Sequence, residues 1–344
     1  MENELTGTEI HPFYDAVTDR FPAGGISKII LGLLLGLLFL IPHYLSVRNT
    51  LFNDWSWFLG VLITVALLSL FYATYTFQNL LQKMDRRTSP EKRDLYMSKT
   101  KRILSDRNFL IIGVLFGFIN AGMGISFGLP YSTALEIGTI LGGYWIAGFV
   151  CGMAIWGIYG ASATIAAYSR SAKSSFDFTS LDKCGGTRFI GEALVVFSSV
   201  TLIVGVMISI YIVKTSWAYQ EELWVTLSRF FWIAFPYGWA LIALIAPVVP
   251  LSRALREYQV DEEFLIKKEL KRIKKCLADE NSTVQQGKEL REEYEFQQTI
   301  RAKLYQMRTW PFSLSMNVRY TSIFMANIIA SAASSYEWII GLRT

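Results

Sequence analysis

Apolar residues are gathered into six long blocks along the chain, and polar connections separate the blocks. Each block has about 18 residues or more, the length that a helix needs to cross about 30 Å of hydrocarbon. The first block is the clearest, because residues 29–41 contain no charged side chain. The pattern predicts an all-α, polytopic membrane helix bundle. Its six transmembrane helices are expected at residues 26–47, 55–77, 109–129, 137–168, 193–213 and 225–251.

The region 252–309, which follows the sixth block, is strongly charged and carries two amphipathic stripes. Apolar residues recur at helical spacing in both stripes. A polar break at residues 279–283 separates them, and Ser282 or Thr283 would cap the second helix. The region therefore predicts a cytoplasmic antiparallel helical hairpin or coiled coil.

The two ends of the chain are less apolar than the blocks. Residues 1–25 form a polar N-terminal segment that lacks the basic start of a signal peptide, so no cleaved leader is expected. At the other end, residues 310–344 combine aromatic side chains with polar ones, and the stretch 318–340 is only moderately apolar. This composition predicts a segment that lies at the membrane interface. A re-entrant segment and a seventh span are the alternatives.

Lysine and arginine in the short connections predict the orientation, because cytoplasmic loops carry an excess of these residues. The connection between the second and third blocks is rich in them, and so is the one between the fourth and fifth, whereas the other three hold only Arg48 and Lys214. This alternation predicts a multi-pass protein of the cell membrane with both termini in the cytoplasm. The basic residues are Lys83, Arg86, Arg87, Lys92, Arg93, Lys99, Lys101, Arg102 and Arg107 in the first loop, and Arg170, Lys173, Lys183 and Arg188 in the second.

The composition changes the range of partners that we expect. Only 18% of the residues are charged and 52% are hydrophobic, so lipid is part of the solvent of this chain. The hairpin carries a basic run between Lys267 and Lys275, but nearby acidic residues can pair with it, which favours a solvated helix face over lipid or nucleic-acid binding. The lipid bilayer, other copies of this chain and a cytosolic protein bound through residues 252–309 are the expected partners.

Signatures of an enzyme are missing from the sequence. The two histidines and three cysteines show no metal-ligand spacing, and no nucleophile elbow or phosphate-binding loop occurs. We therefore predict no catalytic residues, no cofactor and no metal site. Ionisable residues inside the blocks mark pumps and proton-coupled transporters. The few present, Glu192, Arg229 and His43, lie near block ends, and we expect them to reach an interface.

Glycines are abundant in the third and fourth blocks, and several lie four residues apart. This spacing lets two helix backbones approach closely in lipid. We predict a packing role, against the alternative that glycines line or bend a pore. The glycines concerned are Gly113, Gly117, Gly124, Gly128, Gly138 and Gly142.

Asn120 is the most polar uncharged residue at mid-membrane depth, with Ser126 nearby and Ser162 and Thr164 on the fourth block. These four side chains are candidates to line a hydrated path. The alternative, which we favour, is an interhelical hydrogen bond.

A turn motif, Asp182-Lys183-Cys184-Gly185-Gly186, precedes the fifth block. Gly185 and Gly186 permit a tight juxtamembrane turn, and Asp182 is suited to cap it or the following helix. Together with the element Trp310-Pro311-Phe312, this motif resembles features of uncharacterised prokaryotic polytopic membrane proteins. The resemblance covers about a tenth of the chain and implies no activity.

Three functions fit these patterns. The first is an oligomeric channel that is gated or assembled through the hairpin, since the spans have little buried charge and many small residues. The second is a membrane-anchored scaffold or signalling component whose hairpin recruits a cytosolic partner. The third is a secondary transporter, for which broken helices at matching positions of an internal repeat would be expected.

Overall fold

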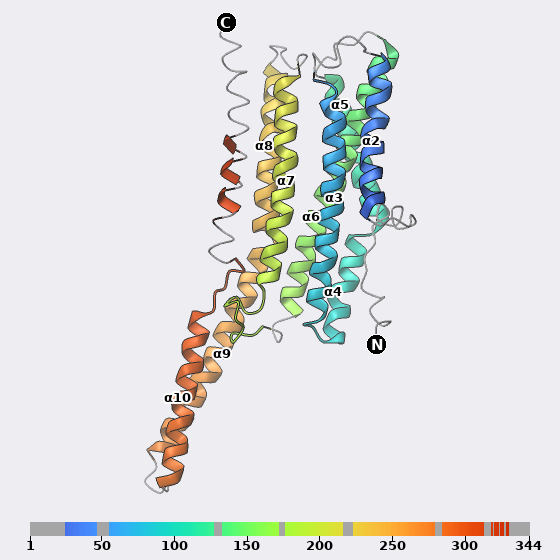
Figure 1. Ribbon diagram of the computed structural model, residues 1–344. Helices are drawn as coiled ribbons and strands as arrows, with labels where there is room; N and C mark the ends of the chain where they lie inside the picture. The colour runs from blue at the N-terminus through green and yellow to red at the C-terminus, as the bar shows by residue number, and fades with distance from the viewer. Residues whose placement is uncertain are drawn as a thin grey trace.

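The structure, a computed structural model, is built from long helices (Figure 1). It describes residues 25–46, 55–126, 133–171, 176–215, 223–278 and 284–312, together with 318, 320–322, 324–326 and 328–329. Within these ranges there is no β-strand. The helices are α2 (Gly25–Ser46), α3 (Phe58–Asp85), α4 (Pro90–Ile103), α5 (Asp106–Ser126), α6 (Ala134–Ser171), α7 (Arg188–Lys214), α8 (Leu223–Ile245), α9 (Val248–Leu277) and α10 (Val284–Gln306).

Six helices in the described part of the chain are long and apolar enough to cross a membrane, and they match the six apolar blocks of the sequence. Large apolar side chains also cover the outside of the bundle, where water would disfavour them. Phe118 on α5, for example, is 66% exposed, and Leu34 on α2 and Phe230 on α8 are exposed as well. Length, composition and this apolar exterior together support a multi-pass membrane protein.

The helices run up and down in a bundle in which α3 packs against α2, α6 and α7, and the pairs α5–α6 and α7–α8 are neighbours. Figure 1 shows α9 and α10 extending away from one end of this bundle. We call this the hairpin end, and the opposite end, where α7 ends and α8 begins, the distal end. One hydrophobic core joins residues of α3, α6 and α7 to the first turns of α9.

Two pairs of glycines bring α5 and α6 into close contact. A Cβ atom added to Gly148 would lie 2.5 Å from the carbonyl oxygen of Phe116, and one added to Gly152 would lie 2.7 Å from that of Ile112. Gly148 and Gly152 face Gly117 and Gly113 on α5, so the four-residue spacing is used on both helices. Of these two pairs, only Gly113 and Gly117 on α5 were predicted from the sequence to pack.

The remaining glycines of the predicted packing set differ among themselves. Gly124 lies against the ring of Tyr144, which a Cβ atom would approach to 2.6 Å. Gly138 and Gly142 have nothing within 4 Å of that position, so packing within the chain does not require glycine there. Gly128 lies outside the described residues.

The basic connection after α3 was expected to be a loop, but it contains a helix. α3 continues beyond the apolar block to Asp85, and α4 begins at Pro90 directly after Ser89. Proline at the first helical position is a recognised start signal, since it needs no hydrogen bond from its nitrogen. α4 packs on α6, where the Thr100 and Thr164 hydroxyls lie 3.0 Å apart.

The helix of the sixth apolar block ends earlier than expected: α8 stops at Ile245, and α9 starts at Val248. Pro247 lies between them, and its ring cannot continue the hydrogen-bond ladder of α8. α9 and α10 then pair as an antiparallel hairpin: Gln259 donates a hydrogen bond to the carbonyl of Leu304, and the guanidinium of Arg272 lies 3.4 Å from the carboxylate of Glu293.

The described residues between 318 and 329 are helical and contact the bundle. Tyr320 packs on Leu202 and Ala240, and its hydroxyl lies 2.6 Å from that of Ser198. Figure 1 draws these residues beside α8. The interfacial location expected for residues 310–344 stays a prediction, since most of that segment lies outside the described residues, as does the N-terminal segment up to residue 24.

Candidate functional site

A cavity of about 210 Å³ lies inside the bundle, between α3, α5, α6, α7 and α8. One buried water needs only about 10–15 Å³ by the same measure, so the space is large enough for a larger guest. Its walls run along α3 from Leu59 to Phe77, which corresponds to about 27 Å of helix length at 1.5 Å per residue. The cavity is therefore long and narrow and extends over most of the thickness of the bundle.

The cavity walls are mostly aliphatic and aromatic. Two threonine hydroxyls that line it are bonded within their own helix: Thr74 donates to the carbonyl of Leu70, and Thr201 donates to that of Phe197. Trp239 on α8 also lines the cavity, and its buried indole N–H has no acceptor among the described residues. The central part of the cavity therefore offers mainly apolar surface, together with the indole N–H of Trp239.

The distal end of the cavity is more polar. The hydroxyls of Tyr144 on α6 and Tyr211 on α7 lie 3.0 Å apart and bridge the two helices, and both residues line the cavity. Arg229, in the second turn of α8, lines the same end. Among the described residues that form the walls, Arg229 is the only charged one.

Arg229 was expected to extend towards a membrane interface, but in the structure its side chain is buried among helices. Its side chain is only 6% exposed. The position in α8 explains the difference, because the residue faces the neighbouring helices of the bundle instead of the outside, where Phe230 and Phe231 are exposed. A guanidinium at this depth needs polar or negatively charged surroundings to offset its loss of water.

The four polar candidates from the sequence are not brought together. Asn120 lines the cavity, but its amide donates a 2.7 Å hydrogen bond to the carbonyl of Tyr144. Ser126 bonds to the carbonyl of Met123 in its own helix. On α6, Ser162 bonds to Ile158 and Thr164 bonds to Gly160. Ser162 is eighteen residues beyond Tyr144, about 27 Å along the helix, so these side chains are far from Asn120.

His43 forms a second buried polar group near the distal end. Its Nε2 atom lies 2.8 Å from the hydroxyl of Ser56, and its Nδ1 atom lies 3.2 Å from that of Thr139. His43 therefore joins α2, the segment just before α3, and α6, and its side chain is buried within the protein. Neither His43 nor Ser56 lines the cavity, and both are fully buried, which favours a structural role over a nucleophile and base.

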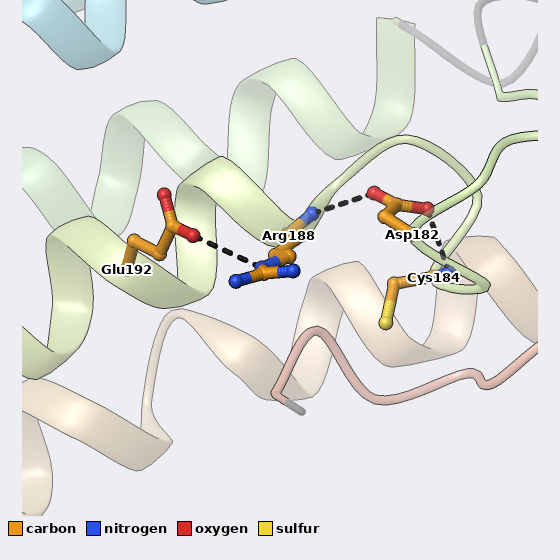
Figure 2. Close-up of polar contacts among 4 residues, drawn as sticks. All are labelled: Asp182, Cys184, Arg188 and Glu192. Atoms are coloured by element: carbon orange, nitrogen blue, oxygen red, sulfur yellow. Dashed lines mark hydrogen bonds and ion pairs between the residues drawn. The ribbon is translucent and has the colours of Figure 1, made fainter. Parts of the chain in front are cut away.

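The turn before α7 is built around the carboxylate of Asp182 (Figure 2). It accepts hydrogen bonds from the backbone N–H groups of Cys184 at 2.8 Å, Gly186 at 3.0 Å and Arg188 at 3.2 Å. Burial raises the pKa of Asp182, but these hydrogen bonds lower it by more, and the net pKa lies below the usual value. The last of the three donors belongs to the first turn of α7, whose free N–H groups favour a negative charge.

Both glycines of this turn have backbone angles that other residues rarely adopt, with φ of 63° at Gly185 and 77° at Gly186. The carbonyl of Gly186 accepts a hydrogen bond from Arg87 in the α3–α4 connection. The same guanidinium lies over the ring of Phe189, 4.9 Å from its centroid. The turn is thus attached to the hairpin-end side of α3.

The turn also contacts the base of the helical hairpin. The N–H of Arg308 donates to the carbonyl of Lys183, and a Cβ atom on Gly185 would lie 2.9 Å from the side chain of Leu255 on α9. Gly191 in α7 abuts the carbonyl of Pro311. The two motifs noted in the sequence, residues 182–186 and 310–312, therefore lie together, and we call this contact region the junction.

No protein-family model matches the sequence, and comparison with curated proteins and with solved structures gave no match.

Proposed function

We propose that this chain binds an apolar or amphipathic molecule inside its bundle and carries it across the membrane. This is the transporter hypothesis among the three that the sequence allows. The cavity between α3, α5, α6, α7 and α8 is the observation that supports it, because its walls run along about 27 Å of α3. That length approaches the thickness of the hydrocarbon region, about 30 Å.

The nature of the walls favours an apolar guest over a hydrated ion. Ions cross membranes along rings of carbonyls, charged side chains or water. Asn120 lines the cavity but is already bonded to a backbone carbonyl. Ser162 and Thr164 bond within α6 and do not belong to the described cavity lining. A water-filled path through one copy of the chain therefore has less support than a slot for a hydrocarbon chain. A channel formed between copies stays a prediction of the sequence.

Cavity filling tests the proposal. Ala154 lines the middle of the cavity on α6, whereas Ala234 on α8 is exposed on the outside of the bundle. In proteoliposomes, a fluorescent sixteen-carbon probe should change leaflets faster with the wild-type protein than without protein. Ala154→Phe should slow this movement and Ala234→Phe should not. Equal rates with and without wild-type protein would contradict carriage, and equal binding of the probe by both variants would contradict binding in the cavity.

We place the chain in the cell membrane with the hairpin end in the cytoplasm. The positive charges of the α3–α4 connection, of α4 and of the loop before α7 support this orientation, since such residues are enriched on the cytoplasmic side. Arg87, Arg170 and Arg188 all belong to this end. Both termini are cytoplasmic in this proposal.

The hairpin supports a second function, self-association. Phe264 on α9 is 67% exposed and Phe296 on α10 is 62% exposed, and Val260 lies one helical turn before Phe264. The hairpin extends beyond the bundle, so lipid does not cover these rings in the way that it covers the spans (Figure 1). Exposed apolar surface of this kind marks interaction sites. We propose a second copy of the chain as the partner, in agreement with the expected homo-oligomer.

The mass of the purified protein in detergent tests this proposal. Wild-type protein should be a dimer or a larger oligomer, and the double variant Phe264→Ser and Phe296→Ser should shift towards monomer. The matched control is Phe118→Ser, because Phe118 is equally exposed but lies on the lipid-facing side of α5. A monomeric wild-type protein, or an oligomer that the double variant leaves intact, would contradict self-association through the hairpin.

A further inference from the structure

Arg229 places a positive charge at one end of the cavity, the distal end. Arg229 is buried and lines the distal end of the cavity, as do Tyr144 and Tyr211 with their paired hydroxyls. Towards the hairpin end the walls are apolar, with Leu70 and Phe77 on α3 and Ala161 on α6. The space is thus divided into a cationic, hydroxyl-bearing end and a long, mainly apolar remainder.

We infer that the guest of this cavity is an anionic amphiphile with one hydrocarbon chain. The inference rests on the proposed function and specifies its substrate class. A carboxylate or phosphate is the group that best matches a guanidinium, which presents several N–H donors in one plane. The attraction between a guanidinium and such an anion is stronger inside a protein than in water.

The shape of the cavity selects a single chain. A volume of about 210 Å³ that is spread along the α3 wall from Leu59 to Phe77 leaves a narrow slot. An extended chain fits such a slot better than a two-chain lipid or a fused ring system. With its head at Arg229, the chain lies along the apolar walls towards the hairpin end, and each buried methylene contributes hydrophobic free energy.

The matched pair of palmitate and methyl palmitate tests this assignment, because both have the same chain and only palmitate is charged. Hexadecyl phosphate is added to distinguish a carboxylate site from a phosphate site. Radiolabelled probes are bound to the full chain in lipid nanodiscs at neutral pH. Wild-type protein should bind at least one of the two anions about tenfold more tightly than the ester, as expected for hydrogen bonds to a charged group.

Arg229→Gln should abolish the preference for the anion, because it should weaken the binding of the charged probes more than that of methyl palmitate. Arg229→Lys should keep part of the preference. Lys214→Gln is the control, because Lys214 ends α7 at the same distal end but does not line the cavity. It should behave like the wild type. If Arg229→Gln does not fold, the wild-type preference and Arg229→Lys decide the question.

Two different failures can be told apart. If methyl palmitate binds, Ala154→Phe blocks it, and the charge of the probe has no effect, the cavity binds a guest but the anionic assignment is wrong. A preference for the anion that survives in Arg229→Gln also overturns the assignment. If none of the three probes binds to wild-type protein, the result contradicts the proposed function itself.

Discussion

Gly117 of α5 and Gly148 of α6 face each other so closely that a Cβ atom added to Gly148 would lie 3.1 Å from the Cα atom of Gly117. The backbones are in contact here, and the same relationship repeats one turn away at Gly113 and Gly152. Lipid supplies no hydrophobic force between helices, so this close approach and the dispersion contacts it allows hold α5 on α6.

Replacing Gly148 with alanine should therefore destabilise the bundle. The added methyl group would lie 2.5 Å from a backbone oxygen, and overpacking of this kind costs about 1–3 kcal/mol. Gly142→Ala is the matched control on the same helix, since nothing lies within 4 Å of its new methyl group. Thermal unfolding in detergent measures both variants. A lower melting temperature for Gly142→Ala than for Gly148→Ala would contradict the assigned interface.

Asp182 should make the stability of the protein sensitive to acid. Its folded pKa lies below the usual value, because the three backbone hydrogen bonds outweigh the effect of burial. The carboxylate therefore stabilises the fold fully above the unfolded pKa of about 3.9, and this contribution is lost as the pH falls through the lower, folded pKa. Melting temperatures measured against pH should fall more steeply in this acid range for wild-type protein than for Asp182→Asn.

At neutral pH, Asp182→Ala should lower stability by about 2 kcal/mol, since it leaves three N–H groups without their charged acceptor. Glu192→Ala is the comparison, because it removes only the exposed ion pair with Arg188 that Figure 2 shows. Exposed pairs contribute about 0.2–1 kcal/mol. Equal losses for the two variants would be evidence against a cap at Asp182.

Gly186→Ala should disturb the junction in two ways. A residue with a side chain is strained by about 1–2 kcal/mol at a positive φ such as the 77° found here. The new methyl group would also lie 2.5 Å from the guanidinium of Arg87 and displace it. In a double-mutant cycle with Arg87→Gln, the combined loss should be smaller than the sum of the single losses. Strict additivity would show that Arg87 and Gly186 are not coupled.

The orientation can be tested with the native cysteines. Cys276 is partly exposed on α9, whereas Cys184 is buried in the junction, and burial raises the pKa of its thiol. A membrane-impermeant maleimide should therefore modify Cys276 in inside-out vesicles of a Cys151→Ser, Cys184→Ser variant. Labelling of the same variant in right-side-out vesicles would place the hairpin outside the cell.

The sequence predicted the main helices well, because the length needed to cross lipid is a strong constraint on composition. The apolar blocks correspond to α2, α3 and α5 to α8. The sequence was less informative about where each helix ends. α3 runs on into polar residues up to Asp85, and Pro247 ends the sixth helix before the apolar pattern does. Packing decides the first of these boundaries, and the proline ring decides the second.

The cavity was harder to foresee, since it depends on which face of each helix turns inward. Hydropathy does not separate an arginine that snorkels to an interface from one that is buried among helices, so the burial of Arg229 was not predicted. The partner of the Gly113 and Gly117 pair was missed for a similar reason. Gly148 and Gly152 do share the four-residue spacing, and an antiparallel α5–α6 pair places them opposite.

The junction also sets an order on the making of the protein. The loop before α7 receives its contacts from Arg308 and Pro311, which the ribosome adds roughly 125 residues after Lys183. At typical rates of synthesis this delay is roughly 6–25 s. During that time the start of α7 has left the ribosome without the residues that will cover it, so closure of the hairpin base on the loop is a late event in biogenesis.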